Sequence, residues 1–150
     1  VGGVMQSPGA ACSGRIIRKE FSDAKDSVVI DLKKAYRQPA LVKLERDFCF
    51  DRKNNTVTVK DIVEFNKPET FETAMVTYGK YKIVSPREVI LYNKRTKVRA
   101  VITATGGTVK ITPEKIDEDT GGAKPWRLGI KFIKPVKQAT LTIRYEKAVD

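Results

Sequence analysis

The sequence contains no histidine, and this absence excludes several kinds of site at once. Histidine is the most common metal ligand and the usual general acid or base near neutral pH. Without it, none of the serines has the partner that a Ser–His–Asp triad requires. The two cysteines, Cys12 and Cys49, are too few to build a thiolate zinc site. We therefore expect no metal or cofactor.

The scarcity of cysteine also means that no disulfide framework holds the fold together. Cys12 and Cys49 could pair in an exported protein, but export does not require them to. Cys49 lies between Phe48 and Phe50 in an alternating pattern, where a small buried thiol is the more common explanation. The sequence leaves the state of this pair open.

Other familiar signals are missing as well. No apolar run approaches the roughly 18 residues of a membrane span, and no secretory signal opens the chain. The first residues, VGGVMQSPGA, lack an initiator methionine and resemble the middle of a longer protein. Gly106 and Gly107 are not followed by the Lys-Ser/Thr pair of a phosphate-binding loop.

Paired carboxylates can hydrolyse glycosidic bonds, and one acidic cluster merits that test. It consists of Glu114, Asp117, Glu118 and Asp119. The four residues share a hydrophilic stretch with glycines and prolines, which is typical of a surface loop at 113–126. Nothing there predicts the raised pKa of a catalytic acid, so solvation is the expected role.

Positive charge is what the sequence has in excess. Its 29 Lys and Arg residues outnumber 18 Asp and Glu, giving a formal charge of +11. Such an excess attracts polyanions, whether nucleic acid, acidic polysaccharide or anionic lipid, without choosing among them. A solvated charged surface with no specific partner is an equally open interpretation. The length of 150 residues suits one domain that buries its own core.

Apolar and polar residues alternate along nearly the whole chain, which is typical of β-strands. We expect about ten strands, at 14–21, 26–36, 41–50, 57–65, 71–78, 88–93, 97–105, 108–112, 127–133 and 139–146. Their close spacing predicts an all-β fold, an antiparallel β-sandwich with little helix. DLKKAY (31–36) could add one helical turn. Residues 1–150 are thus expected to form a single β-sandwich domain.

Two strand pairs can be described in more detail. The polar turn DRKNN predicts a hairpin within 41–65. Its core face is expected to hold Val42, Leu44, Phe48, Phe50, Val57, Val59, Val63 and Phe65. A second pair is expected across KPVKQ, with Leu128, Ile130 and Phe132 facing Leu141, Ile143 and Tyr145.

Basic residues cluster near aromatic residues in three phrases, KYK (80–82), LYNKRTKVR (91–99) and KPWRLGIKF (124–132). A short turn should project the charges of the second phrase together. An exposed tryptophan beside cations can stack on a sugar or a base, but packing of Trp126 over the end of the sandwich is the favoured alternative. The candidate polyanion-binding residues are Lys94, Arg95, Lys97, Arg99, Lys124, Trp126 and Arg127.

Several phrases, in a shared order, resemble the C-terminal part of heparinase II/III-like polysaccharide lyases. VGGVMQSPG resembles the family's NG-x-x-Q-x-x-G segment, and DLKKAY resembles D-L-T-x-A-Y. The hairpin resembles R-x-F-x-F-D-R-K-x-x-x-x-V-x-D through Arg46, Phe48, Phe50, Asp51, Arg52 and Asp61. PETFET and WRLGIKF also fit, so the resemblance covers nearly all of the chain.

The resemblance implies a larger parent in which an α/α toroid precedes β-sandwich domains. Such enzymes cleave uronic-acid polysaccharides by β-elimination, using a tyrosine or histidine as the base, and are periplasmic or secreted. The family's catalytic Asn/Tyr/His set lies on the toroid and just before the NG-x-x-Q phrase. We therefore carry over no catalytic residue, and expect this chain alone not to be an enzyme.

Three functions follow as hypotheses. The first is a non-catalytic C-terminal β-sandwich of a polysaccharide lyase, which contacts the toroid and offers a surface to acidic glycans such as glycosaminoglycans. The second is an autonomous polyanion-binding module. Nucleic acid as the partner comes third, because no RNA-binding aromatic signature is present.

Overall fold

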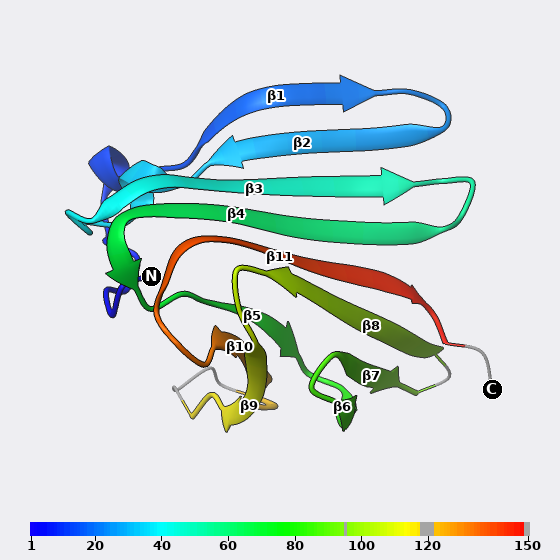
Figure 1. Ribbon diagram of the computed structural model, residues 1–150. Coiled ribbons are helices and arrows are strands. Elements are labelled where there is room, and N and C mark those ends of the chain that lie inside the picture. The colour runs from blue at the N-terminus through cyan, green and yellow to red at the C-terminus, as the bar shows by residue number, and fades with distance from the viewer. Residues whose placement is uncertain (95, 118–121, 149–150) are drawn as a thin grey trace.

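The computed structural model describes residues 1–94, 96–117 and 122–148, which form an all-β fold (Figure 1). Its strands are β1 (Arg15–Phe21), β2 (Lys25–Asp31), β3 (Leu41–Asp51), β4 (Thr56–Glu69), β5 (Glu72–Thr77), β6 (Lys80–Ser85), β7 (Glu88–Asn93), β8 (Thr96–Thr105), β9 (Val109–Lys115), β10 (Trp126–Phe132) and β11 (Val136–Lys147). Two short 3₁₀ turns, η1 (Ala10–Cys12) and η2 (Lys33–Ala35), are the only helical elements in these ranges. Neither could cross a membrane.

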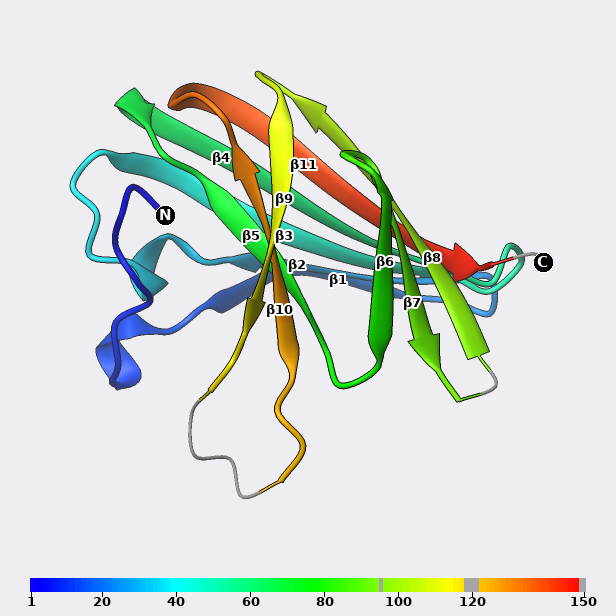
Figure 2. The ribbon, with the colours of Figure 1, turned by 90° about the horizontal axis from the view of Figure 1, so that it is seen from below.

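The strands form two antiparallel sheets. The large sheet has eight strands in the order β1-β2-β3-β4-β11-β8-β7-β6, and the small sheet has three in the order β5-β10-β9. The small sheet lies against one face of the large sheet, with its strands crossing those behind it (Figure 2). We call the covered side of the large sheet its inner face and the opposite side its outer face. The predicted sandwich is confirmed.

The core lies between the two sheets and is built from alternate residues of both. The large sheet contributes Val63, Phe65, Ile102 and Leu141, and the small sheet contributes Leu128, Ile130 and Phe132. Each of these side chains is at most 2% exposed. Burial of a large apolar side chain is worth roughly 1.5–3 kcal/mol, so this layer supplies most of the force that holds the sheets together.

The β3–β4 hairpin is confirmed, with a turn at 52–55, but its predicted core face is only partly right. Leu44, Val63 and Phe65 are buried, whereas Val42, Phe48 and Val57 are 44%, 38% and 39% exposed. A bulge between Leu41 and Lys43 shifts the alternation and turns Val42 outward. Phe48 and Val57 lie near the β3–β4 turn, and Figure 2 shows that the ends of β3 and β4 at this turn extend beyond the small sheet.

Two further expectations need correction. The strands 127–133 and 139–146 do not form a pair, because β10 belongs to the small sheet and β11 lies between β4 and β8 in the large one. Their apolar residues instead face one another across the core. The predicted count also omits β6, the edge strand beside β7. The turn expected in DLKKAY is present as η2, and Cys12 and Cys49 are both free thiols.

Candidate functional site

The basic turn between β7 and β8 lies at one end of the sandwich, but its charges differ in their surroundings. Lys94 and Lys97 are exposed. Lys94 occupies the left-handed region at φ 46°, which allows the tight turn. Arg95 lies outside the described residues. Arg99, two residues further along β8, is only partly exposed and points from the outer face.

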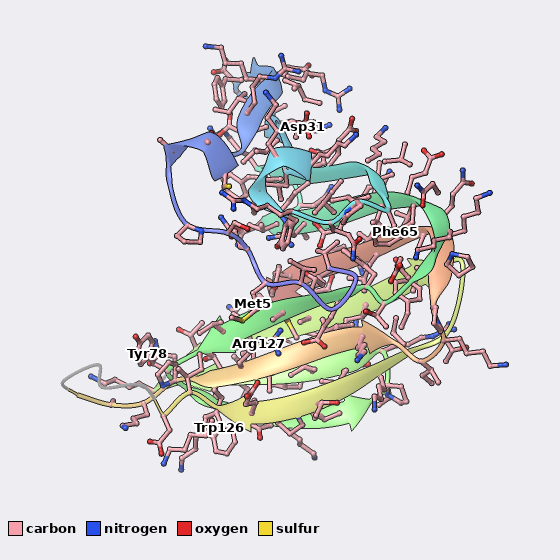
Figure 3. All side chains as sticks on the ribbon, turned by 90° about the vertical axis from the view of Figure 1, so that its left-hand side faces the viewer. Met5, Asp31, Phe65, Tyr78, Trp126 and Arg127 are labelled. Carbon is pink, nitrogen blue, oxygen red and sulfur yellow. The ribbon has the colours of Figure 1, made fainter. Side chains whose placement is uncertain are left out.

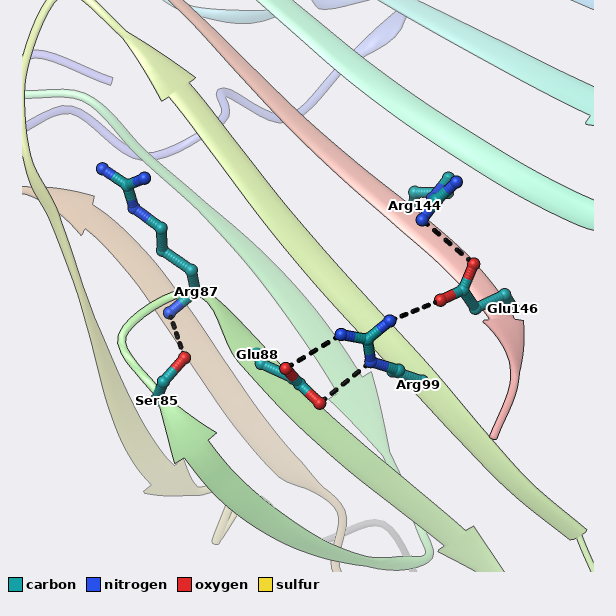
Figure 4. A network of polar contacts seen from close by, with 6 residues as sticks. All are labelled: Ser85, Arg87, Glu88, Arg99, Arg144 and Glu146. Carbon is teal, nitrogen blue, oxygen red and sulfur yellow. Dashed lines mark hydrogen bonds and ion pairs between the residues drawn. The ribbon is translucent and has the colours of Figure 1, made fainter. Parts of the chain in front are cut away.

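Arg99 is held by two carboxylates rather than offered to a ligand (Figure 4). Its Nε donates to Glu88 Oε1 at 2.9 Å and its Nη1 donates to Glu146 Oε1 at 2.8 Å. Arg144 adds a second cation to Glu146 at 3.1 Å. The hydrogen bond from Arg99 lowers the pKa of Glu88, and the two carboxylates raise the pKa of Arg99. Because Glu88 and Glu146 neutralise its charge, Arg99 has little charge left for the predicted binding of a polyanion.

The second predicted group, at 124–127, is likewise occupied. Lys124 donates to Asp117 at 2.6 Å. Arg127 pairs with Glu72 and, at 3.6 Å, with Glu114, on the outward side of the small sheet. In Figure 3 Arg127 lies beneath the N-terminal segment near Met5.

Trp126 points the opposite way from Arg127 and meets the edge of Tyr81, with 5.3 Å between the ring centroids. This position fits the hypothesis that Trp126 packs over the end of the sandwich better than the hypothesis that its ring is exposed for stacking on a sugar or a base. The residues predicted at 94–99 and 124–127 therefore do not form one continuous basic patch.

The structure instead brings together three residues from neighbouring strands. Lys80 on β6 is directly opposite Tyr92 on β7, and Tyr92 is directly opposite Lys97 on β8. Directly paired residues share a face of a sheet, and Tyr81 and Leu91, next to them in sequence, pack on the core side. Lys80, Tyr92 and Lys97 therefore form a row across the outer face, here called the lysine–tyrosine row. With strands about 4.8 Å apart, its two lysines stand roughly 10 Å from each other.

A hollow of about 580 Å³ adjoins this row at the β5–β6 turn. Its lining consists of Tyr78, Gly79, Lys80, Tyr81, Tyr92, Asn93 and Lys94. Tyr78 is 71% exposed and stands at this end of the molecule (Figure 3). The turn depends on Gly79, because a Cβ there would lie 2.1 Å from the carbonyl oxygen of Tyr92. The absence of a side chain at Gly79 thus allows β6 to pair closely with β7.

This arrangement combines aromatic and cationic side chains on one face. A tyrosine ring offers an apolar face and a hydroxyl, while lysine ammonium groups attract carboxylates and sulfates as mobile point charges. Lys80 and Lys94 make no ion pair with any residue that the structure describes. In the sequence, the phrase KYK and the basic residues that follow Tyr92 already indicate a basic site with aromatic residues. The position of Tyr92 between two lysines requires knowledge of strand register.

A buried ion pair inside the sandwich was not predicted. Arg46 on β3 donates to both oxygens of Asp61 on β4, at 2.6 and 2.8 Å, and to the Thr73 hydroxyl on β5 at 2.8 Å. Asp61 is 1% exposed. The contact to Thr73 ties the large sheet to the small one, and every polar atom named here has a partner. The sequence signal was a charge on the apolar face of each hairpin arm.

Little in the described residues suggests acid–base or metal chemistry. The expected loop at 113–126 begins later than predicted, because Glu114 lies on β9, where it engages Arg127. Asp117 engages Lys124, and Glu118 and Asp119 lie outside the described residues. No group of three metal-ligating side chains occurs within 1–94, 96–117 and 122–148. Burial raises the pKa of Tyr145 to about 12, the opposite direction from that required of a tyrosine base.

The fold is similar to parts of proteins of known structure. The structure matches heparan sulfate lyase HepC from Pedobacter heparinus with a TM-score of 0.72 and 10% identity, over 91% of this chain and 22% of that one. A heparinase III gene product matches with a TM-score of 0.68 and 10% identity, over 88% of this chain and 21% of the other.

Its fold is similar to one part of these lyases. The expected resemblance is thereby confirmed at the level of fold, and the chain spans about a fifth of the length of the lyases that it matches. No protein-family profile and no curated protein matches the sequence.

Proposed function

We propose that this chain is a non-catalytic β-sandwich portion of a heparinase II/III-like polysaccharide lyase, which supports the parent enzyme and binds acidic glycan. The parent would cleave a uronic-acid polysaccharide by β-elimination, in the periplasm or outside the cell. The observation that carries this proposal is the match to two lyases over about nine-tenths of this chain but about a fifth of theirs.

The uncovered half of the large sheet supports a place in a larger protein. Phe21 and Phe48 are 65% and 38% exposed on the inner face, beyond the edge of the small sheet. Val57, also exposed, and the partly exposed Phe50 continue the same apolar surface. Contiguous exposed apolar residues rimmed by polar ones are typical of contact surfaces. A neighbouring part of the parent would complete the second layer over Phe21 and Phe48.

A non-catalytic role is consistent with the residues at hand. The family's catalytic set lies upstream of the phrase that VGGVMQSPG resembles, and the sequence has no histidine. Ultraviolet absorbance of the unsaturated product would detect elimination. With heparan sulfate, alginate or hyaluronan as substrate, the isolated chain should give no increase, and a sustained increase would refute this part of the proposal.

The glycan-binding part of the proposal rests on the lysine–tyrosine row. Lys80→Ala and Tyr92→Ala should each weaken binding of the isolated chain to immobilised heparin by about five-fold, as expected for loss of one favourable contact. Lys19→Ala on β1 removes the same charge from an exposed site remote from the row and serves as the control. Equal retention of all four proteins would show that the net charge of +11, not the row, is responsible.

An autonomous polyanion-binding module is the alternative, because the same charge and the exposed ring of Tyr78 would also suit a nucleic acid. Both ligands should bind less tightly as salt rises, so salt dependence does not separate them. Direct competition does. We expect a uronate polymer to displace single-stranded DNA at lower concentrations of charged groups than the reverse, and the opposite order would favour the nucleic-acid reading.

A further inference from the structure

A second cavity lies at the end of the sandwich where the β3–β4 turn, the start of β8 and the end of β11 meet, near the end marked C in Figure 1. Its volume is about 510 Å³, within the range of ligand pockets. The lining consists of Phe50, Asn55, Val57, Thr96, Lys97, Val98, Tyr145, Glu146, Lys147 and Ala148. We call this cavity the end pocket.

The floor of the end pocket is apolar and includes two aromatic rings. Phe50, Val57 and Tyr145 are neighbours in one row across β3, β4 and β11, so their side chains share the inner face. Phe50 is restrained from the other side, since the Arg52 guanidinium lies over its ring at 5.2 Å. Arg52 is itself tied to Asp26. The floor is thus a firm surface rather than a loose cluster of side chains.

The rim of the end pocket is polar and carries positive charge. Lys97 and Lys147 are exposed at its margin. Glu146, the one carboxylate among the lining residues that the structure describes, is already engaged by Arg99 at 2.8 Å and Arg144 at 3.1 Å on the outer face. Lys147 shares the inner face with Tyr145, whereas the side chains of Lys97 and Glu146 project from the outer face, so an anion on the floor of the pocket meets the ammonium group of Lys147.

Neutral hydrogen-bonding groups complete the rim. Asn55 closes the β3–β4 turn at φ 48°, in the left-handed region. The turn is fixed by Asp51, which accepts hydrogen bonds from the backbone and the side chain of Asn54 at 3.0 and 2.7 Å. Asn55 is therefore presented from a defined backbone position and shares the pocket lining with Thr96 at the start of β8.

We infer that the end pocket binds one ring of an acidic sugar, with the C–H face of the ring on Phe50 and Tyr145, its carboxylate toward Lys147, and its hydroxyls toward Asn55 and Thr96. An apolar floor with a few convergent polar groups suits a carbohydrate ring, which has both kinds of surface. A fatty acid would leave the amide and hydroxyl rim unpaired.

This inference extends the proposed function and rests on it for the class of ligand. Lys97 belongs both to the lysine–tyrosine row and to the end pocket. Because the row lies on the outer face and the floor of the pocket on the inner face, a polymer over Lys80, Tyr92 and Lys97 would pass around the start of β8 to place a ring in the pocket. The row would hold the polymer by charge, and the pocket would recognise a single ring.

Titration of the isotope-labelled chain with short ligands tests the inference by NMR. The probes are an unsaturated uronate disaccharide, a neutral glucose disaccharide and hexanoate. The uronate disaccharide should shift backbone resonances near Asn55 and Lys147, with much weaker effects from the other two. Asn55→Gly keeps the left-handed backbone and Lys147→Gln keeps the length of the side chain. Each should weaken the uronate affinity by about five-fold.

Lys80→Ala is the control variant, because it lies in the row and outside the pocket lining. It should leave the disaccharide affinity unchanged while weakening retention on heparin. Unchanged disaccharide affinity in both pocket variants would overturn the inference and leave the row intact. Tighter binding of hexanoate than of the uronate would overturn the assignment of ligand class. Disaccharide binding without any effect of Lys80→Ala on heparin would instead count against the row.

Discussion

Asp61 is the most tightly enclosed charged residue that the structure describes, and its environment explains why it is tolerated in an apolar core. Both carboxylate oxygens accept hydrogen bonds from Arg46, and the same guanidinium reaches the hydroxyl of Thr73. A buried charge without such partners would cost several kcal/mol. The pair thus fixes the β3–β4 register and the approach of β5.

Removal of one partner should therefore be far worse than removal of both. Asp61→Ala leaves Arg46 charged and partly buried and should lower the free energy of unfolding by about 3 kcal/mol. The double variant Arg46→Met/Asp61→Leu replaces both with apolar groups and should recover much of that loss. Urea denaturation measures the difference, with exposed Glu20→Ala as the control. Additive losses in the double variant would contradict this account.

Tyr145 makes stability depend on alkaline pH. Burial raises its pKa to about 12 in the folded chain, whereas an unfolded tyrosine ionises near 10. The unfolded state therefore loses its proton first, and stability should fall as pH rises from about 10 to about 12. The wild-type chain should lose on the order of 2 kcal/mol more than Tyr145→Phe over this window. Parallel curves of stability against pH for the two proteins would exclude this linkage.

The sequence shows that these charged residues are present but does not show which residues they pair with. Arg46 and Asp61 interrupt the apolar faces of the two hairpin arms, at positions that pair directly in the structure. Likewise, the basic turn and the phrase KYK were recognised, whereas the occupied state of Arg99 and Arg127 was not. Alternation assigns a residue to a face, but only register shows which neighbour neutralises its charge.

At the scale of elements, β3 shows how coverage divides one strand into two environments. Its first half lies under the small sheet, where Leu44 is 3% exposed, and its second half extends beyond it, where Phe48 is 38% exposed. The period of two is the same throughout the strand. Sequence pattern therefore predicted ten of the strands and the sandwich, but not the extent of the second layer.

Two phenylalanines on the same hairpin test this division. Phe65 is fully buried on β4, so Phe65→Ala should cost about 3–5 kcal/mol. Phe48→Ala should cost clearly less, because much of that ring already contacts water. Lys43→Ala, on the outer face, should be nearly neutral. Urea midpoints compare the three variants, and a Phe48 variant as unstable as the Phe65 variant would mean that the inner face is covered along its whole length.

Strand pairing was the other property that alternation could not predict. β10 and β11 follow one another closely and share a pattern, yet the chain crosses from the small sheet to the large one between them. The crossing places Leu128 and Leu141 on opposite sides of one core. β6 escaped recognition because its exposed lysines mask the alternation, as expected of an edge strand protected by charge.

At the scale of the molecule, charge and apolar surface are distributed unequally. On the outer face, Arg99 and Arg144 are balanced by Glu88 and Glu146, whereas Lys80 and Lys94 have no ion pair with a described residue. The lysine–tyrosine row and the end pocket both lie at an end of the large sheet. The uncovered apolar surface lies on the inner face of β1–β4 and meets the floor of the end pocket at Phe50 and Val57.

The uncovered apolar surface should give the isolated chain measurable affinity for an environment-sensitive dye such as anilinonaphthalene sulfonate. Phe21→Ser with Val57→Thr should reduce dye fluorescence, while stability changes little because these side chains are 65% and 39% exposed. Lys19→Gln is the matched control, since it removes a neighbouring charge that could attract the anionic dye. If dye fluorescence falls in Lys19→Gln but not in the Phe21→Ser/Val57→Thr variant, the dye binds through charge and not through the apolar surface. It would also remove the support that this surface gives to a place within a larger protein.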